Sequence, residues 1–329
     1  MADENPSHEP KSDIYTQASA DGHFKRQTAS FRSHITSSST EFPPEPHRYV
    51  LYINYGCPWA HRANLVLHLK GLTPFIQLVV MDYEIGPEGW FYSGRLGTAP
   101  RDPVYGFTLH RQLYHKADPS YDKRYTVPVL WDKKYETIVS NESSEIIRML
   151  YSAFDHLLPE ERREASRPLY PAHLRGKIDE MNTWVYDTIN NGVYKTGFAA
   201  TQEAYDANVY PLFQSLDRLE EHLGQEGHQP YLFGDHITEA DIRLYTTLVR
   251  FDVAYHGMFN CNLKMIRHDY PRLHAWLRRL YWDDSDETNA GAFRNTTHFE
   301  HIKRGYCKVQ KIPVLPAGPD PNILPIDAK

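Results

Sequence analysis

The chain has 329 residues, more than one average domain, so we expect two compact units and an additional tail. Its 36 Lys and Arg residues against 42 Asp and Glu residues give a formal net charge of -6 without a long run of one sign, which argues against a nucleic-acid-binding protein. No apolar window is long enough to span a bilayer and the N-terminus lacks the apolar core of a signal peptide, so we expect a cytoplasmic protein without a membrane partner.

The N-terminal segment, residues 1–47, is polar and rich in Ser, Pro and His, and it ends in "EFPPEPHR". Such a composition supports few buried contacts, and closely spaced prolines interrupt helices and strands. We therefore expect a loosely ordered arm that can wrap around the body of the protein.

A strand, a helix and a second strand open the first domain, which we expect to span residues 48–160. The apolar run "YVLYIN" (49–54) predicts a buried strand, the segment 58–70 a helix, and "FIQLVVMDY" (75–83) a second strand. Because the helix lies between two strands in the chain, the pattern predicts a βαβ unit.

The second half of this domain follows a long insertion. Residues 84–125 are aromatic and glycine-bearing with no clear period, which is typical of a functional loop. The segment "TVPVLWDKKYETIVSN" (126–141) then predicts two short strands joined by a turn, and "ESSEIIRMLYSAF" (142–154) predicts a helix. The expected order of the first domain is therefore βαβ-ββα.

Residues 161–311 show a 3.6-residue period in place of the strand pattern, and we expect an all-α helical bundle there. Four segments predict its longer helices: "HLRGKIDEMNTWVYDTI" (173–189), "NVYPLFQSLDRLEEHL" (208–223), "EADIRLYTTLVRFDVAY" (239–255) and "YPRLHAWLRRLYW" (270–282). Thr238 and Asp241 are spaced to form a capping box at the start of the third helix. The remaining residues, 312–329, are proline-rich and are expected to form an extended tail.

The three cysteines, Cys57, Cys261 and Cys307, have neither a CxxC pair nor the spacing of zinc ligands, so we expect no disulfide framework and no metal. Cys57 directly follows an expected strand and precedes Pro58, a residue that suits the first turn of a helix. A helix N-terminus stabilises a thiolate, so we expect the pKa of Cys57 to fall below the free value of about 8.5. The alternative is a small buried residue, and we assign that role to Cys261 and Cys307.

Two residues on the same helix, His61 and Arg62, lie close to this thiol. His61 is one turn from Cys57 and could add positive charge, but packing or capping is the better explanation. We do not include either residue among the catalytic candidates.

Two further motifs fit a thioredoxin-like domain around the thiol. In "TVPV", a proline that opens a strand fits a cis bend, which would turn the backbone N–H and C=O of Val127 toward Cys57. In "SNESSE", Glu142 and Ser143 begin a helix, where free N–H groups and the Ser143 hydroxyl can bind a carboxylate and Glu142 can bind an ammonium. Together they can hold an α-amino acid, although ordinary helix capping explains Glu142 and Ser143 equally well.

With these motifs the chain resembles the glutathione transferases, in particular their Xi class, the glutathionyl-hydroquinone reductases, which are related to the Omega class. The motifs stand in the order and approximate spacing of that class: "NYGCPWAHR", "TVPVLWD", "NESSEI", "NNGVYKTGFA", "GDHITEADIRLYTTLVRFD" and "HFEHIKRGYC". The resemblance implies a glutathione-binding domain followed by a helical electrophile-site domain, glutathione as co-substrate, no metal, and a homodimer.

The resemblance also implies roles for individual residues. Cys57 is the implied nucleophile. Glutathione is implied to bind Trp90, Arg124, Val127, Glu142 and Ser143.

Tyrosines of the helical domain are implied to receive the second substrate. They fall on Tyr194, Tyr255 and Tyr306, although core packing is the alternative for each of them. Two positions depart from the class pattern, Thr196 where a Cys is expected and Cys307 where a second Tyr is expected. Both bear on substrate preference.

The implied reaction is the glutathione-dependent reduction of glutathionyl-hydroquinones to hydroquinones. It passes through a mixed disulfide between Cys57 and glutathione, which a second glutathione resolves to oxidised glutathione. A thiol transferase or dehydroascorbate reductase of the Omega type is an alternative with the same thiol and a different second pocket. A conjugating transferase, which needs Ser or Tyr to activate glutathione, fits less well. A non-catalytic protein that binds aromatic ligands or regulatory partners would keep its effect without Cys57.

Overall fold

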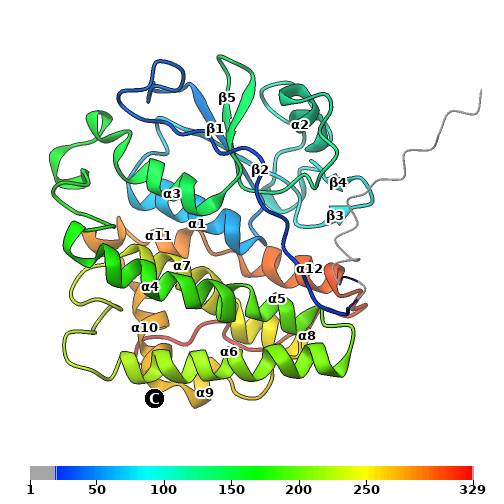
Figure 1. The fold of residues 1–329 in the computed structure, drawn as a ribbon, viewed down its shortest axis with the longest axis vertical. Helices are drawn as coiled ribbons and strands as arrows, with labels where there is room; N and C mark the ends of the chain where they lie inside the picture. Colours follow the sequence, from blue (N-terminus) through cyan, green and yellow to red (C-terminus); the bar gives the residue numbers. More distant parts are fainter. Residues whose placement is uncertain (1–18, 20, 328–329) are drawn as a thin grey trace, which may run out of the picture.

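The structure is a computed structural model that describes Ser19 and residues 21–327. A small mixed sheet and three α-helices form one part of the molecule, and a bundle of helices forms the other (Figure 1). The prediction of a thioredoxin-like α+β domain followed by an all-α domain is confirmed.

The elements of the first part follow the predicted order, with additions in the insertion. They are β1 (Tyr49–Ile53), α1 (Pro58–Leu69), β2 (Gln77–Val80), β3 (Ile85–Gly86), β4 (Gly89–Trp90), α2 (Arg111–Ala117), β5 (Val129–Asp132), β6 (Thr137–Ser140) and α3 (Ser143–Ser152). The helices of the second part are α4 (Arg175–Val185), α5 (Gly192–Gly197), α6 (Gln202–His222), α7 (Glu239–Leu248), α8 (His256–Met258), α9 (Ile266–Asp269), α10 (Pro271–Trp282), α11 (Ala292–Asn295) and α12 (Phe299–Val309).

The sheet has the strand order β2-β1-β5-β6, with β1 parallel to β2 and antiparallel to β5. Strand β6 is antiparallel to β5. All five residues of β1 are buried, as expected for the continuous apolar run of a central strand. The chain therefore forms the predicted βαβ unit followed by a ββα unit, and Cys57 lies where β1 passes into α1.

Several predicted elements have different bounds. Strand β2 is shorter than the predicted run 75–83, because its pairing with β1 covers only four positions. Helix α6 begins earlier than predicted, since the Thr201 hydroxyl caps it by accepting from the Ala204 N–H at 3.1 Å. The predicted helix 239–255 ends as α7 at Leu248, and a π-helical turn follows it at Phe251–Tyr255.

The N-terminal arm is packed over the part that the structure describes, residues 21–47, whereas residues 1–18 and 20 lie outside the described residues. Phe24, Ile35 and Phe42 are buried in this segment. The arm starts beside α5 and runs along the boundary between the two parts toward the sheet (Figure 1). Loose order is thus not observed for residues 21–47, because large apolar side chains interrupt the polar composition and pack against the body.

The insertion and the tail also contact the body. Residues 84–125 are not a bare loop, since they contain the β3–β4 hairpin and helix α2. Residues 312–327 contain no helix or strand, and their carbonyls accept hydrogen bonds from the helical part, for example Ala317 from Lys303 and Leu324 from Trp282. Within the described residues, no helix has the length and apolar character needed to cross a membrane.

The predicted capping box at the start of α7 is present and is extended by two further donors. The buried Asp241 carboxylate accepts from the Thr238 N–H and hydroxyl, each at 2.9 Å, from the Leu232 N–H at 3.0 Å and from the Trp276 indole at 2.9 Å. One carboxylate therefore joins the start of α7, the preceding loop and α10.

Replacing this carboxylate should destabilise the helical part strongly. We expect Asp241→Ala to lower the free energy of unfolding by about 3 kcal/mol, because it leaves several buried donors without an acceptor. Urea unfolding followed by circular dichroism measures the effect. Asp235→Ala, at an exposed position of the same segment, is the control and should change stability by less than about 0.5 kcal/mol. Equal stability of the two variants would contradict the structural role of Asp241.

Candidate active site

Cys57 is the residue that precedes α1, and its backbone is fixed by the end of β1. Its N–H donates to the side-chain oxygen of Asn54 at 3.1 Å and lies 3.2 Å from the Asn54 carbonyl oxygen. A Cβ added at Gly56 would lie 3.0 Å from the Asn54 side-chain oxygen, so a larger residue would displace the Asn54 side chain that accepts from Cys57. Pro58 occupies the first turn of the helix, as predicted.

The thiol faces the start of β5. The Cys57 Sγ atom lies 3.8 Å from the carbonyl oxygen of Val127, and the Val127–Pro128 peptide bond is cis, as the sequence predicted. The backbone of Val127 is therefore the nearest polar neighbour that the thiol proton can reach.

A buried guanidinium supports the loop before Cys57 from the helical part. The fully buried Arg250 donates through Nε to the Gly56 carbonyl oxygen at 3.0 Å and through Nη2 to the Tyr55 carbonyl oxygen at 3.0 Å. Its Nη1 atom lies 2.7 Å from the Thr246 carbonyl oxygen and 2.9 Å from His61 Nδ1. The position of the thiol thus depends on a residue almost 200 positions further along the chain.

His61 and Arg62 have structural contacts, in line with the packing role expected for them. Because Arg250 can only donate, His61 Nδ1 accepts and Nε2 carries the proton, which it donates to the Thr296 hydroxyl at 2.9 Å. Burial and the neighbouring Arg250 charge hold the pKa of His61 well below its usual value. Arg62 is buried and donates to Asn190 at 2.7 Å.

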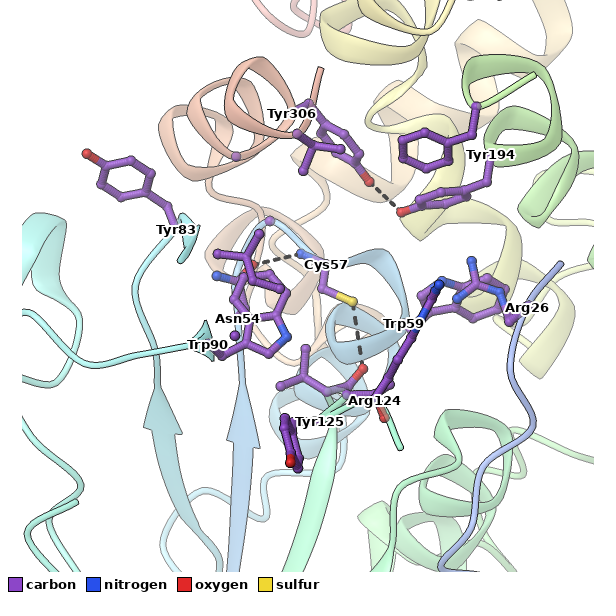
Figure 2. A pocket seen from close by; sticks show the side chains of 18 residues that line it. Arg26, Asn54, Cys57, Trp59, Tyr83, Trp90, Arg124, Tyr125, Tyr194 and Tyr306 are labelled. Carbon is purple, nitrogen blue, oxygen red and sulfur yellow. Dashed lines mark hydrogen bonds between the residues drawn. The ribbon is translucent and has the colours of Figure 1, made fainter. Parts of the chain in front are cut away.

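Cys57 opens into a cavity of about 180 Å³ between the two parts of the molecule, here called the Cys57 cavity. Figure 2 shows Trp90 and Arg124 on the side of the first domain and Tyr194 and Tyr306 on the opposite side, above the thiol. Among the described residues, no carboxylate lines this cavity. Its walls combine aromatic rings with cationic and neutral polar groups, which suits an aromatic ligand that carries or develops negative charge.

Burial raises the pKa of the Cys57 thiol, although the backbone N–H groups of Ala60 and Trp59 and the charges of Arg250 and Arg26 act in the opposite direction. The predicted fall in pKa is therefore wrong for this structure: the helix N-terminus stabilises the thiolate as expected, but desolvation has the larger effect. A thiolate with a higher pKa is also the stronger nucleophile once it forms.

The structure brings the three predicted tyrosines together, but only two of them line the Cys57 cavity. The Tyr306 hydroxyl lies 2.7 Å from the Tyr194 hydroxyl and 2.7 Å from the Tyr255 hydroxyl. Tyr194 and Tyr306 line the cavity, whereas Tyr255 has no exposed surface and lies behind Tyr306. Burial raises the pKa of each of the three phenols, so all of them keep their protons at neutral pH.

A second, smaller pocket adjoins the first and is here called the Glu142 pocket. It is lined by Glu142, Ser143 and, in common with the Cys57 cavity, by Val127, Arg124 and Arg26. Glu142 also caps α3, because its Oε1 atom accepts from the Ser144 N–H at 3.0 Å and from the Ser144 hydroxyl at 2.9 Å. Glu142 therefore caps α3 and at the same time lines the Glu142 pocket.

The two departures from the class pattern do not line either pocket. Thr196 is buried on α5, and Cys307 is buried with its Sγ atom 3.9 Å from the sulfur of Met258. Neither position contacts the space next to Cys57.

Sequence reasoning missed Arg250, Asn54 and Arg26. For Arg250 the sequence held one indication of its buried position. It is the one cation in the apolar run "LVRFDVAY", and a buried charge requires a partner inside the protein. Asn54 and Arg26 had none, since a polar residue at a strand end and a cation in a polar arm are both ordinary.

No metal site emerges from the described residues, which contain no group of three or more His, Cys, Asp or Glu side chains able to hold an ion.

Comparison with known proteins identifies the family. Residues 56–153 match the family described as the glutathione S-transferase N-terminal domain, and residues 202–279 match the glutathione S-transferase C-terminal domain. The crystal structure of the Xi glutathione S-transferase from Phanerochaete chrysosporium is similar, with 52% identity, a TM-score of 0.86, and coverage of 92% of this chain and 100% of that one.

The chain belongs to the Xi class of the glutathione transferases.

Two further members of the family bear on its chemistry. The Xi glutathione transferase ECM4 from Saccharomyces cerevisiae, in complex with glutathione, is 40% identical with a TM-score of 0.85, and the match covers 92% of this chain and 99% of that one. The glutathionyl-hydroquinone reductase YqjG from Escherichia coli is 45% identical over 304 residues, 90% of this chain and 88% of that protein. Cys57 lies within the matched N-terminal domain, and Tyr194 of α5 and Tyr306 of α12, which face it across the cavity, lie on either side of the matched C-terminal range.

Glu142 offers a test that separates ligand binding from capping. Glu142→Gln keeps a side-chain oxygen that can accept from Ser144 but removes the charge, whereas Glu142→Ala removes both. If Glu142 binds the ammonium of glutathione, both variants should lose about 1.5–3 kcal/mol of glutathione affinity in calorimetry. Only Glu142→Ala should also lose about 1 kcal/mol of stability, the usual cost of a lost cap. Unchanged affinity in Glu142→Gln would show that the residue only caps the helix.

Proposed function

We propose that this Xi-class transferase is a glutathionyl-hydroquinone reductase with Cys57 as its nucleophile. The observation that carries the proposal is the single thiol at the start of α1, which faces the Tyr194 and Tyr306 phenols across a cavity without carboxylates. The activity named for the E. coli relative, at 45% identity over most of both chains, agrees with it.

In this proposal the glutathione part of the substrate lies across the two adjoining pockets. Its cysteine backbone pairs with Val127, its ammonium meets Glu142, and its α-carboxylate meets the N-terminus of α3 at Ser143. Trp90 and Arg124 line the Cys57 cavity and complete the glutathione-binding residues that the resemblance implies. The glutathione complex of ECM4 supports glutathione as the co-substrate.

Pairing of glutathione with Val127 would also affect the thiol. The Val127 carbonyl oxygen, 3.8 Å from Sγ, is the acceptor nearest to the thiol proton. A peptide N–H that binds this oxygen competes with the thiol for it, so the thiol loses a partner that favours its protonated form. Substrate binding and thiol ionisation are therefore coupled.

The Cys57 thiolate then attacks the sulfur of glutathione, which forms a disulfide and breaks the bond from sulfur to the ring carbon. The electron pair of that bond remains with the ring, and a proton from the Tyr194–Tyr306 pair converts the ring to the hydroquinone. A second glutathione attacks the mixed disulfide, releases oxidised glutathione and restores Cys57. Ala60 stands where a dithiol enzyme has its second cysteine, so the resolving thiol is that of free glutathione.

The Omega-type alternatives need the same thiol, but their substrates have no aromatic ring that must bind in the second pocket. The paired phenols of Tyr194 and Tyr306, 2.7 Å apart at the cavity wall, favour a hydroxylated aromatic substrate. A non-catalytic binding protein would not need the thiol. We further propose that the protein works in the cytoplasm, where glutathione keeps its free cysteines reduced, and that it forms the homodimer implied by its class.

The nucleophile can be tested by mass spectrometry. Incubation with oxidised glutathione should add one glutathione to the wild-type protein at Cys57, and Cys57→Ser should remain unmodified and fail to turn over a glutathionyl-hydroquinone. Cys307→Ala is the control and should behave as the wild type, because Cys307 is buried away from both pockets. Modification mainly at Cys261 or Cys307 would contradict the assignment.

The tyrosines should contribute unequally. We expect Tyr194→Phe or Tyr306→Phe to lower turnover of a glutathionyl-hydroquinone by roughly 10²- to 10⁴-fold, the range of general acid catalysis, and Tyr255→Phe to have a smaller effect because it contacts only Tyr306. The rate of Cys57 alkylation by iodoacetamide should stay nearly unchanged in all three variants. Full turnover in all three variants would show that these tyrosines only pack in the core and take no part in the reaction.

A further inference from the structure

Arg26 of the N-terminal arm reaches the active site from outside both domains. It lines the Cys57 cavity, as Figure 2 shows, and it also lines the Glu142 pocket. Its Nε atom donates to the side-chain oxygen of Asn191 at 2.7 Å. Its guanidinium carbon lies 4.3 Å from the centre of the Trp59 ring and 5.1 Å from that of the Tyr194 ring. Two aromatic rings and one amide thus fix the orientation of the guanidinium.

The guanidinium has no anionic partner among the described residues. No Asp or Glu oxygen there lies within ion-pair distance of Arg26, and only its Nε–H has a hydrogen-bond acceptor. The other Lys and Arg residues of residues 21–48 are all paired with carboxylates: Lys25 with Asp21, Arg32 with Glu145 and Arg48 with Asp132. Arg26 therefore presents its terminal N–H groups, on an exposed side chain, to the pockets.

The charge of Arg26 acts on the groups that surround the reacting sulfur. It lowers the pKa of Cys57 and of Tyr194, in opposition to the larger effect of burial on both. Negative charge that forms in the Cys57 cavity is therefore stabilised from this side.

The proposed reaction generates such a charge on the substrate. When Cys57 Sγ bonds to the glutathione sulfur, the pair of electrons from the broken carbon–sulfur bond stays with the ring. An aryl carbanion is a poor leaving group. If a proton has first moved from a ring hydroxyl to the carbon that carries sulfur, the electron pair passes to the ring oxygen instead and forms a phenolate. A proton from the Tyr194–Tyr306 pair then converts the phenolate to the hydroquinone. The ring is reduced by two electrons, and the Cys57 and glutathione sulfurs are oxidised to a disulfide.

We propose that Arg26 is a further substrate-binding residue, whose guanidinium donates hydrogen bonds to a ring oxygen of the glutathionylated hydroquinone and stabilises the negative charge on that oxygen as the carbon–sulfur bond breaks. This inference rests on the proposed function. It makes the N-terminal arm part of the active site and makes a ring oxygen a requirement for full activity.

Two substrates separate this role from a role in binding glutathione. We would compare the wild type with Arg26→Gln and Arg26→Lys on a glutathionyl-hydroquinone and on the mixed disulfide of glutathione with 2-mercaptoethanol, whose leaving group has no ring oxygen. Lys25→Gln is the matched control, because it removes one charge from the neighbouring position of the arm. Calorimetric titration with glutathione measures binding of the tripeptide.

We expect Arg26→Gln to lower turnover of the glutathionyl-hydroquinone by about 10²-fold, the usual cost of removing an oxyanion donor, with partial recovery in Arg26→Lys. Turnover of the mixed disulfide should fall much less, because it loses only the effect of Arg26 on the Cys57 thiolate. The affinity for glutathione and the activity of Lys25→Gln should remain close to wild type. Equal losses on both substrates would overturn the proposal, because Arg26 would then act on the Cys57 thiol. A loss of glutathione affinity would overturn it too, because Arg26 would then bind the tripeptide. Full activity of Arg26→Gln would overturn it as well. A wild-type protein that reduces the mixed disulfide but not the glutathionyl-hydroquinone would instead refute the proposed function.

Discussion

The interaction on which the site depends is the insertion of the Arg250 guanidinium beneath the loop that carries Cys57. Removing a cation from water costs several kcal/mol, and here no carboxylate among the described residues compensates for it. The compensation comes from three carbonyl oxygens and one imidazole nitrogen, all at hydrogen-bond distance. Two of these acceptors, the carbonyl oxygens of Tyr55 and Gly56, directly precede the thiol. Since Arg250 follows α7 and the loop follows β1, the thiol has its observed position only when the two parts of the molecule are packed together.

The choice of neutral partners for Arg250 has a chemical consequence. A carboxylate beside it would cancel its charge, whereas carbonyl dipoles orient the guanidinium and leave its net charge to act on Cys57. The same holds for Arg26, which is held by Asn191 and two aromatic rings. With two uncancelled cations, a helix N-terminus and no carboxylate on the cavity wall, the site is organised to tolerate negative charge on sulfur and on a ring oxygen. Burial opposes ionisation of the thiol, so this stabilisation is needed.

The parts of this site that could be predicted are those encoded within short segments. A strand, a cysteine and a proline in succession predicted the position of Cys57 at the start of α1, and "TVPV" predicted the cis peptide bond that brings Val127 to the thiol. The parts that could not be predicted depend on contacts between distant segments. Arg250 follows α7 inside an apolar run, which indicates burial but not the groups that it contacts. Arg26 lies in a polar arm, where nothing local distinguishes it from a surface cation. The raised pKa of Cys57 has the same origin, because local sequence reveals the helix dipole but not how deeply the folded chain buries the sulfur.

The most direct measurement is a crystal structure of the Cys57→Ser variant bound to a glutathionyl-hydroquinone. We predict that the glutathione sulfur lies roughly 3–3.5 Å from the side chain at position 57, the separation expected of a near-attack geometry, with the ring against Tyr194 and Tyr306. A complex in which the tripeptide occupies the Glu142 pocket but the ring points out of the Cys57 cavity, or in which the sulfur lies far from position 57, would contradict the proposed reaction.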